Sequence, residues 1–442
     1  MEGRQIVRHK YQGLLLTGAL AAMIAAGCSS SKPSSSNTTS GGSATTSGGS
    51  ATTNGSANNT ASAPGVTATT VKVGFITSET GNAASTFSDS LKGAQAAFDA
   101  VNNAGGINGR KITLVSADDQ SSPAGDLAAT QSLISQGVFM IENFSPYAFG
   151  GYKAAQQQGI PIVGGAFDGP EWGTQPNTNM FSYTGGYPAS GQQSANTQIA
   201  NFFKLVGATN VGGLAYGISP SSTSSIVNTK KALESIGLKM GYENLSVPFG
   251  GVDVTGYVLA MKQAGVDGAA CSCVQSTNLA LFTALHQAGL NNVKALSFSS
   301  ADSSLFASAT AAAAAQGAYY ATLIPPPDVN SSAQKTFQAN VMAVDPSIKA
   351  DSIPSYGLVG SYLAAEVGVE GLTVAGQNPT RQSFITNLTA VASWTANGLL
   401  ASPVGWDHFG TPQPHVCGYF VQVSGTNFKT INNNQPVCGN SF

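Results

Sequence analysis

From position 71 onward, short apolar runs of strand length alternate with longer segments whose apolar residues recur every three or four positions. The short runs are typical of buried parallel strands, and the longer segments of helices that cover a sheet. Strands are predicted at residues 71–76, 112–117, 139–141, 160–163, 211–216, 238–245, 268–274 and 295–298. Helices are predicted at residues 91–101, 127–134, 151–158, 192–205, 226–236, 257–264, 279–288, 333–342, 356–371 and 381–388. This alternation indicates right-handed parallel crossovers, so the expected fold class is α/β with open, mostly parallel sheets.

A passage rich in Gly, Pro and Asn at residues 164–188 interrupts the alternation, which restarts at residue 192. A chain of 442 residues is too long for one compact core. We therefore expect two α/β lobes, and a cleft between two such lobes is well suited to hold a small molecule.

The first 28 residues have the layout of a bacterial export signal. Arg4, Arg8 and Lys10 precede an apolar stretch at residues 14–26, and the small residues Ala-Ala-Gly at 25–27 precede Cys28. The apolar stretch is shorter than the roughly 20 residues that span a bilayer. A cysteine directly after the cleavage site resembles the lipobox of bacterial lipoproteins, which implies a lipid anchor at Cys28. The alternative is an ordinary secretory signal followed by an unrelated cysteine.

Residues 28–68 are predicted to form a disordered linker behind this 1–27 signal peptide. The segment consists almost entirely of Ser, Thr, Gly, Asn and Ala, and it carries the near-repeat Gly-Gly-Ser-Ala-Thr-Thr at 41–46 and 48–53. Such a composition buries too little apolar surface to offset the entropy of ordering. The linker would tether a folded body to the outer face of the bacterial cell membrane.

Charge and motifs argue against two other classes of protein. The net charge is −2 and only 9% of residues are charged, so no basic surface suggests a nucleic-acid partner. The four histidines have no Ser or Cys partner at a recognisable spacing. The sequence also lacks Gly-x-Ser-x-Gly, His-Glu-x-x-His and phosphate-loop motifs, so we expect no enzyme, no cofactor and no metal.

The cysteines of the body suggest one cross-link. Cys417 and Cys438 flank a predicted hairpin, and an exported chain favours a disulfide between them. Cys271 and Cys273 lie two apart on a predicted strand and so point to the same face. No second pair of ligands lies nearby in sequence, so we interpret them as small buried hydrophobic residues and not as a metal site.

An ordered series of short motifs resembles the branched-chain amino acid ABC transporter substrate-binding proteins, which are type I periplasmic binding proteins. The series is strongest in the first third of the body. It comprises Gly81, Gly-Ala-Gln-Ala-Ala at 93–97, Asn-Asn-Ala-Gly-Gly-Ile-Asn-Gly-Arg-Lys at 102–111, Asp-Asp at 118–119, and Gln-Gly-Ile-Pro-Ile-Val at 158–163. Ala-Gly-Val-Asp at 264–267 and Ala-Gly-Leu at 288–290 match repeated helix–strand junctions in the second half.

The resemblance implies two lobes joined by three hinge crossings. We place these crossings near residues 183–186, 321–326 and 400–403. Lobe one would then comprise residues 69–184 plus 324–401, and lobe two residues 185–323 plus 402–442.

The resemblance also implies a ligand site on the loops that follow the strands. Ser145 falls where the family places a serine whose hydroxyl, with backbone N–H groups, holds a ligand carboxylate; its alternative role is a helix cap. Ala166 and Asp168 fall on the second ligand loop. Asp168 would bind a ligand ammonium or donor, or would form an ordinary Asp-Gly turn. Phe298 stands near the position where amino-acid receptors carry an acidic residue.

Further candidates come from aromatic and polar residues near the same loops. Phe144, Tyr147 and Phe167 suggest an aromatic wall, although core packing explains each of them equally well. Tyr216 and Gln275 are predicted to end strands of lobe two and to close over the ligand. Phe87 is a candidate for the rim of the site.

These patterns predict a monomeric, lipid-anchored, extracytoplasmic solute receptor that delivers a small polar solute to an ABC permease. An amino acid, an amide or a short carboxylate would fit. Three alternatives stay open at this stage: a ligand sensor of the same fold, a cell-envelope enzyme and an adhesive lipoprotein.

Overall fold

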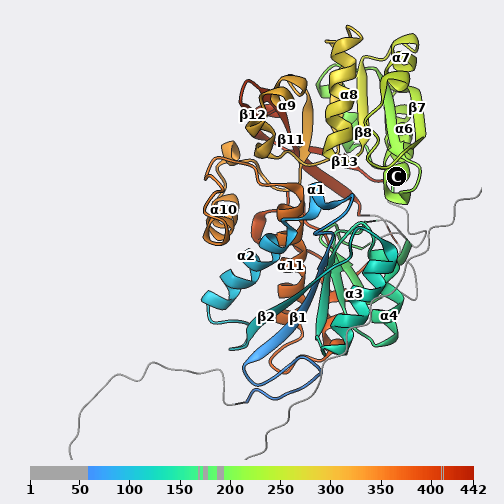
Figure 1. Ribbon diagram of the computed structural model, residues 1–442. Coiled ribbons are helices and arrows are strands. Elements are labelled where there is room, and N and C mark those ends of the chain that lie inside the picture. Colours follow the sequence, from blue (N-terminus) through green and yellow to red (C-terminus); the bar gives the residue numbers. More distant parts are fainter. Residues whose placement is uncertain (1–57, 168–169, 173–177, 187–193, 410, 412) are drawn as a thin grey trace, which may run out of the picture. The chain divides into compact units, whose positions relative to one another are not determined.

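The computed structural model describes residues 58–167, 170–172, 178–186, 194–409, 411 and 413–442. Figure 1 shows two α/β units, each built on its own sheet. This confirms the fold class predicted from the alternating sequence pattern. Within the described part of the chain, no helix is long and apolar enough to cross a membrane.

The first sheet is entirely parallel and has the strand order β2-β1-β3-β4-β5. Its strands are β1 (Thr70–Thr77), β2 (Lys111–Asp118), β3 (Met140–Phe144), β4 (Ile162–Gly164) and β5 (Met180–Ser182). The helices packed in this lobe are α1 (Ala84–Phe87), α2 (Ser90–Asn103), α3 (Pro123–Ser135), α4 (Tyr152–Gln157), α10 (Ser332–Val344), α11 (Tyr356–Val374) and α12 (Arg381–Thr389). Short 3-10 turns are η1 (Ala148–Gly150), η2 (Pro170–Trp172), η4 (Pro327–Val329) and η5 (Ala396–Gly398).

Both faces of the first sheet are covered, as a parallel sheet requires. On β1, Val73 and Phe75 pack into the core that contains α2 and α11, whereas Ile76 packs into the core that contains α3 and α4. Gly93 allows α2 and α11 to approach closely, because a Cβ at Gly93 would collide with the carbonyl of Leu358. α11 is therefore a central buried helix of this lobe.

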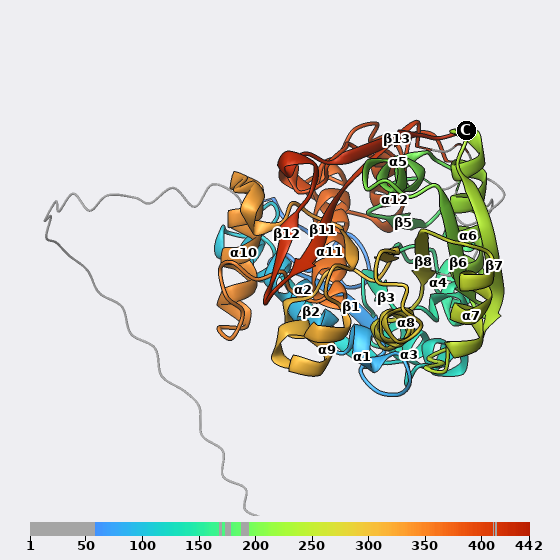
Figure 2. The ribbon, with the colours of Figure 1, turned by 90° about the horizontal axis from the view of Figure 1, so that it is seen from above.

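The second sheet has the order β12-β11-β10-β9-β8-β6-β7, with β13 paired to β11. Its parallel strands are β6 (Asn210–Tyr216), β7 (Lys239–Val247), β8 (Gly268–Ser272), β9 (Lys294–Ser297) and β10 (Tyr319–Thr322). The strands β11 (His415–Ser424), β12 (Asn427–Thr430) and β13 (Val437–Asn440) form antiparallel pairs. The red C-terminal strands in Figure 2 are these three.

The helices of the second lobe divide between two cores. They are α5 (Gln198–Leu205), α6 (Pro220–Ser235), α7 (Thr255–Gln263), α8 (Gln275–Gln287) and α9 (Ala309–Ala314), with the 3-10 turns η3 (Ser303–Ala307) and η6 (Asn432–Asn434). On β8, Ala269 and Cys271 face the core that contains α7 and α8, whereas Ala270 faces the core that contains α5 and α6. The alternation along β8 therefore buries both faces of this sheet as well.

The end of the predicted linker is bound to the first lobe. Arg110, only 1% exposed, donates from Nε to the carbonyl of Thr67 at 2.7 Å and from Nη2 to the carbonyl of Thr60 at 2.9 Å. Its Nη1 donates to the carbonyl of Gln377, and the backbone N–H of Thr60 donates to Asn378 Oδ1 at 2.9 Å. Residues 58–68, which were predicted to be the end of the linker, are therefore part of the folded body in this structure. The lobe limits at 184, 324 and 401 stay predictions.

Candidate functional site

The carboxyl ends of strands from both sheets surround a pocket of about 140 Å³. It is lined by Thr86, Phe87, Pro146, Phe167 and Tyr356 from the first lobe, and by Tyr216, Ser219, Ser221, Ser222, Phe249, Ser272, Cys273, Val274, Phe298 and Ser299 from the second. Most of these residues end a strand or lie in the loop that follows one, which is where open α/β sheets bind their ligands. We call it the cleft pocket and treat it as the candidate functional site.

The first-lobe wall is a group of packed aromatic rings. The Phe87 and Phe167 rings, which line the pocket, lie 5.4 Å apart edge to face. Behind them lies the fully buried Phe144, whose ring centroid is 5.8 Å from that of Phe87 and 5.1 Å from that of Phe167. Tyr356 at the start of α11 lies 6.1 Å from Phe87. Edge-to-face pairs of this kind add stability beyond their burial and hold the rings in place.

The loop that carries Phe167 is held in place by a hydrogen bond from a buried tryptophan. The indole Nε1 of Trp172 donates to the carbonyl of Phe167 at 2.9 Å, and the Trp172 side chain is buried. Ala166 is also buried, with φ of 54°, a left-handed backbone conformation that costs energy in a residue other than glycine. The loop therefore holds Phe167 toward the pocket while Ala166 lies behind it. Asp168, the other candidate on this loop, lies outside the described residues.

The second-lobe wall is built around Tyr216, the last residue of β6. Its ring lies 4.9 Å from that of Phe249, its hydroxyl is 2.7 Å from Thr277 Oγ1, and the N–H of Val274 donates to it at 3.1 Å. Burial raises the pKa of Tyr216, so the hydroxyl stays protonated. Tyr216 is thus a rigid, neutral part of the wall.

The serines of this wall come from the start of α6. Ser219 caps the helix by accepting from the N–H of Ser222, and Pro220 occupies its first turn. Ser222 Oγ accepts from the N–H of Tyr216 at 2.9 Å and donates to the carbonyl of Ser272 at 2.6 Å. On the next loop, Ser299 Oγ donates to the carbonyl of Cys273 at 2.6 Å. These bonds join the ends of β6 and β8 and the loop after β9 into one surface.

Ser145 is not among the residues that line the cleft pocket. Its side chain is fully buried and its hydroxyl donates to Asp119 Oδ2, while its Oγ accepts from the N–H of Tyr147 at 2.9 Å. Ser78 Oγ also donates to Asp119, at 2.7 Å. Burial raises the pKa of Asp119, and the hydrogen bonds from Ser145 and Ser78 oppose that shift. Ser145 therefore orders the loop in this structure, and its contact with a ligand carboxylate stays a prediction.

The remaining sequence candidates fall into two groups. Phe87, Phe167, Tyr216 and Phe298 line the cleft pocket together. Phe144 supports the pocket from the core, and Tyr147 precedes η1 outside the lining. Gln275 requires a correction: it opens helix α8 and does not end a strand, because β8 stops at Ser272. Its Nε2 donates to Tyr320 Oη at 3.1 Å, inside the second lobe.

Several lining residues were not anticipated. Ser219, Ser221 and Phe249 follow predicted strands, so the rule that ligands bind at carboxyl ends could have identified them. Thr86 is next to the predicted Phe87. Tyr356 had no signal in the sequence, because it reaches the pocket from the first turn of α11, far along the chain.

The described residues contain two disulfides. One joins Cys417 on β11 to Cys438 on β13, at paired positions of the two strands. The other joins Cys271 to Cys273. The sequence interpretation of this second pair was right about burial but missed the bond. His415 lies beside Cys417 and Cys438, with their possible ligand atoms within 4.8 Å, but metal binding needs thiolates and both sulfurs are in the disulfide.

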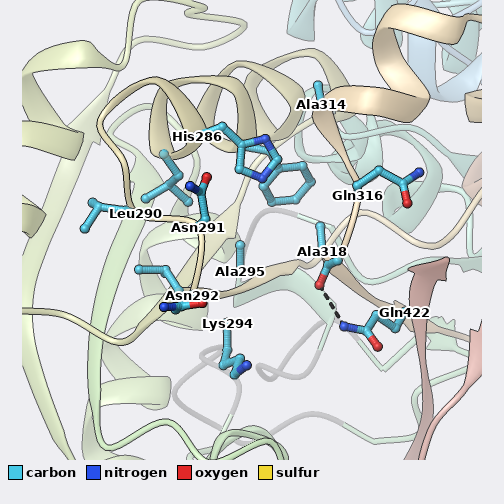
Figure 3. A pocket seen from close by; sticks show the side chains of 14 residues that line it. His286, Leu290, Asn291, Asn292, Lys294, Ala295, Ala314, Gln316, Ala318 and Gln422 are labelled. Carbon is cyan, nitrogen blue, oxygen red and sulfur yellow. Dashed lines mark hydrogen bonds between the residues drawn. The ribbon is translucent and has the colours of Figure 1, made fainter. Parts of the chain in front are cut away.

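Other cavities lie away from the cleft pocket. Figure 3 shows one of about 120 Å³, lined by His286 of α8, Lys294 at the start of β9, and Gln422 of β11, which donates to the carbonyl of Gly317 at 3.1 Å. It lies at the amino ends of strands, where open sheets do not place their ligands. A larger cavity of about 550 Å³ is lined by Asp89, Asp302 and other polar residues. There Asp89 accepts from Ser355 Oγ, and Asp302 from the N–H of Ser304 at 2.8 Å.

Similarity to known proteins agrees with this geometry. Residues 70–428 match the sequence model of the periplasmic binding protein family. A Leu/Ile/Val-binding protein homolog from Brucella melitensis is 31% identical over 179 residues, which cover 40% of this chain and 46% of the relative. The alignment thus spans about half the length of the curated relatives that the chain matches.

Solved structures share the fold at low identity. A fatty acid ABC transporter substrate-binding protein from Thermomonospora curvata has a TM-score of 0.68 and 20% identity, covering 84% of this chain and 93% of that one. A solute-binding protein from R. palustris in complex with benzoate has a TM-score of 0.65 and 16% identity, covering 83% and 97%. A leucine binding protein from Thermotoga maritima has a TM-score of 0.65 and 16% identity, covering 81% and 97%. With two α/β lobes and a family match over most of its length, the chain belongs to the periplasmic binding protein family.

Proposed function

We propose that this chain is an extracytoplasmic solute-binding lipoprotein of an ABC importer, and that it captures a small solute in the cleft pocket. Membership of the periplasmic binding protein family implies a location outside the cytoplasm. The family and the solved neighbours are solute-binding proteins, and we propose the same for this chain in place of catalysis. A monomer that docks on a membrane permease would complete this role.

The cleft pocket is the observation that carries the proposal. Phe87, Phe167, Tyr216 and Phe298 come from both lobes and from separate loops, yet they line one space. Rotation of one lobe toward the other would enclose a molecule bound there, which is the common response of two-lobe receptors to ligand. The proposed ligand contacts are therefore these four aromatic residues, with Ser145 and Asp168 as further candidates.

The classes of solute to test are chosen from the proteins of similar structure. Among them are a fatty acid ABC transporter substrate-binding protein, a benzoate-bound protein and a leucine binding protein. Amino acids, amides and carboxylates are therefore the compounds to test first. The apolar lining of the cleft pocket favours solutes with a hydrophobic body.

A thermal-shift screen of the full chain tests the proposal. The chain would carry Cys28→Ser, so that it is not lipidated, and would be screened against amino acids, amides, ureas and carboxylates. A ligand at a hundred times its dissociation constant adds about 2.7 kcal/mol to the free energy of unfolding, which corresponds to a rise of about 3 °C in Tm for a body of this size. Phe298→Ala should abolish the shift, whereas Phe442→Ala, at an exposed position, should keep it. A broad panel without any shift would refute solute binding.

The lipid anchor needs a separate test. Produced in a bacterium that processes lipoproteins, the full chain should sediment with membranes, and Cys28→Ser should release it into the soluble extracytoplasmic fraction. Mass spectrometry of the mature N-terminus should find diacylglycerol on Cys28. A mature chain that starts elsewhere and carries no lipid would show that the signal is an ordinary secretory one.

A further inference from the structure

The loop between α10 and α11 contributes one residue to the core of the opposite lobe. Both helices, labelled in Figure 1, pack in the first lobe, where Phe337 of α10 and Leu358 of α11 belong to the same hydrophobic core. Ile353 lies between them in sequence, but it is 5% exposed and belongs to the core of the second lobe that contains α7 and α8. A residue from a loop of the first lobe is therefore buried in the second.

Two hydrogen bonds with Ser303 hold Ile353 in this position. Ser303 is the first residue of η3 in the second lobe, and its N–H donates to the carbonyl of Ile353 at 2.8 Å. The hydroxyl oxygen of Ser303 accepts from the N–H of Ile353, also at 2.8 Å. Withdrawing Ile353 would expose an apolar side chain and leave these backbone groups without partners. We therefore expect the contact to persist while the lobes move.

Two residues further along, the chain is fixed to the first lobe. Ser355 caps α11 by accepting from the backbone N–H three residues on, at 3.3 Å, and its Oγ donates to Asp89, which precedes α2. In the first turn of α11, a Cβ on Gly357 would collide with the carbonyl of Thr86, so this turn lies directly against α1. Only Pro354 separates the residue held by the second lobe from the residue held by the first.

The short distance between these two fixed points limits how far the lobes can separate. Cα atoms two residues apart lie at most about 7 Å from one another in a fully extended chain. On the other side of Ile353 the chain has more slack. There the carbonyl of Lys349 accepts from Gln338 Nε2 of α10 at 2.5 Å, and residues 350–352 lie between Lys349 and Ile353. The connection through Pro354 is therefore the shorter one and sets the limit.

We propose that residues 353–355, which we call the tie, hold the two lobes together beside the cleft pocket, in addition to the three predicted hinge crossings. Tyr356, the next residue, lines the cleft pocket, so the second lobe stays close to this side of the pocket. The lobes then admit a solute by rotating about the tie, which opens the pocket on the side away from Tyr356. The inference rests on the proposed function only in that the lobes rotate around a solute, and it holds for any solute.

Insertions of Gly-Ser-Gly-Ser test the tie in the full chain carrying Cys28→Ser, without solute. Placed after Pro354, the insertion keeps both fixed points but adds up to about 13 Å of reach between them. Placed after Ala350, the same insertion lengthens the loop on the other side of Ile353 and leaves the tie at its natural length. The second insertion is therefore the matched control.

Pulsed electron paramagnetic resonance measures the distance between the lobes. Spin labels on Phe149→Cys in η1 and Ile218→Cys after β6 occupy exposed positions, and the four described native cysteines are in disulfides. The insertion after Pro354 should lengthen the mean distance by about 5 Å or more, which is part of the added reach. The insertion after Ala350 should leave the distance unchanged. No change with either insertion, or the same change with both, overturns the inference.

Substitutions test the fixed point in the second lobe. Ile353→Ala should speed hydrogen exchange at the N–H of Ser303 about tenfold or more and lengthen the distance between the labels. Ile348→Ala is the matched control and should change neither value, because Ile348 belongs to the same loop but packs against the core of the first lobe. Exchange at the wild-type rate in Ile353→Ala would overturn the inference. None of these measurements uses a solute, so their failure leaves the proposed function to be decided by the thermal-shift screen.

Discussion

Glu366 offers the sharpest quantitative test of the structure. It lies on α11 inside the first lobe and is 8% exposed, with Asn397 Nδ2 donating to its Oε2 at 3.2 Å. Burial raises the pKa of Glu366 from 4.5 to about 7; a hydrogen bond with Tyr362 opposes the shift, and the nearby charge of Glu370 adds to it. The perturbation is Glu366→Gln, which keeps the shape and the hydrogen bonding but cannot ionise.

The expected magnitude follows from linkage. A carboxyl group whose pKa is higher in the folded than in the unfolded chain stabilises the fold below its unfolded pKa, and this stability is lost as the pH rises through the folded pKa. The pKa of Glu366 rises from 4.5 in the unfolded chain to about 7 in the fold, and each pH unit between these values corresponds to about 1.4 kcal/mol. By pH 8, Glu366 therefore lowers the free energy of unfolding by about 3 kcal/mol. The free energy of unfolding of Glu366→Gln minus that of the wild type should therefore be larger at pH 8 than at pH 4.5, by up to that amount.

Urea unfolding between pH 4.5 and pH 8 measures this difference. Tryptophan fluorescence suits the assay, because Trp172, Trp394 and Trp406 all lie in cores of the first lobe, where Glu366 lies. Asp99→Asn, at an exposed position of α2, should follow the wild type at every pH. Some pH dependence should remain in Glu366→Gln, since burial also raises the pKa of Asp126 to about 7. If wild type and Glu366→Gln change in parallel over the whole range, Glu366 is ionised in the fold and the reasoning is wrong.

Three further variants probe other parts of the structure. Arg110→Ala leaves the carbonyls of Thr60 and Thr67 without their hydrogen-bond donor, so the free energy of unfolding should fall by about 3 kcal/mol. Proteases should then cleave between residues 58 and 68, and resistance equal to that of the wild type would contradict the described contacts. Replacing both Cys417 and Cys438 by Ser removes a cross-link between residues 21 apart in sequence and should lower the free energy of unfolding, measured by thermal unfolding, by about 3 kcal/mol. No change in stability would show that the pair is reduced in the mature protein. Phe144→Ala should cost about 4 kcal/mol and also weaken solute binding, because the rings of Phe87 and Phe167 rest on it; a stability loss with full affinity would show that the wall stands without this support.

Most of the fold could be read from the sequence because its elements bury apolar residues with regular periods. Two helices extend further toward their amino ends than the predicted segments: residues 127–134 are part of α3, which begins at Pro123, and α6 begins at Pro220 and not at residue 226. Ser-Pro pairs supply the cap and the first turn of both helices, whereas the prediction followed apolar spacing alone. The short strands β5 and β10 were missed: β5 lies within the passage rich in Gly, Pro and Asn at residues 164–188, and three or four residues alone give little alternation to recognise.

The site was predictable where it depends on strand ends and unpredictable where it depends on tertiary packing. Phe87, Phe167 and Phe298 follow strands and were anticipated. Phe144 shares that position, yet it turns into the core, where Gly360 on α11 leaves room for its ring. Tyr356 joins the pocket only because α11 packs along α2. Neither fact is encoded within a window of neighbouring residues.

The position of β11 between β10 and β12 has a consequence for how the protein is made. The second sheet is completed by residues 415–440, after the chain has already built α10, α11 and α12 against the first sheet. Until those last strands arrive, β10 presents an unpaired edge that invites association with other chains. A chain cut short before β11 should therefore aggregate instead of leaving a smaller soluble receptor. Under the proposed export of the chain, completing the sheet last would also keep the second lobe from closing while the tail is still in transit.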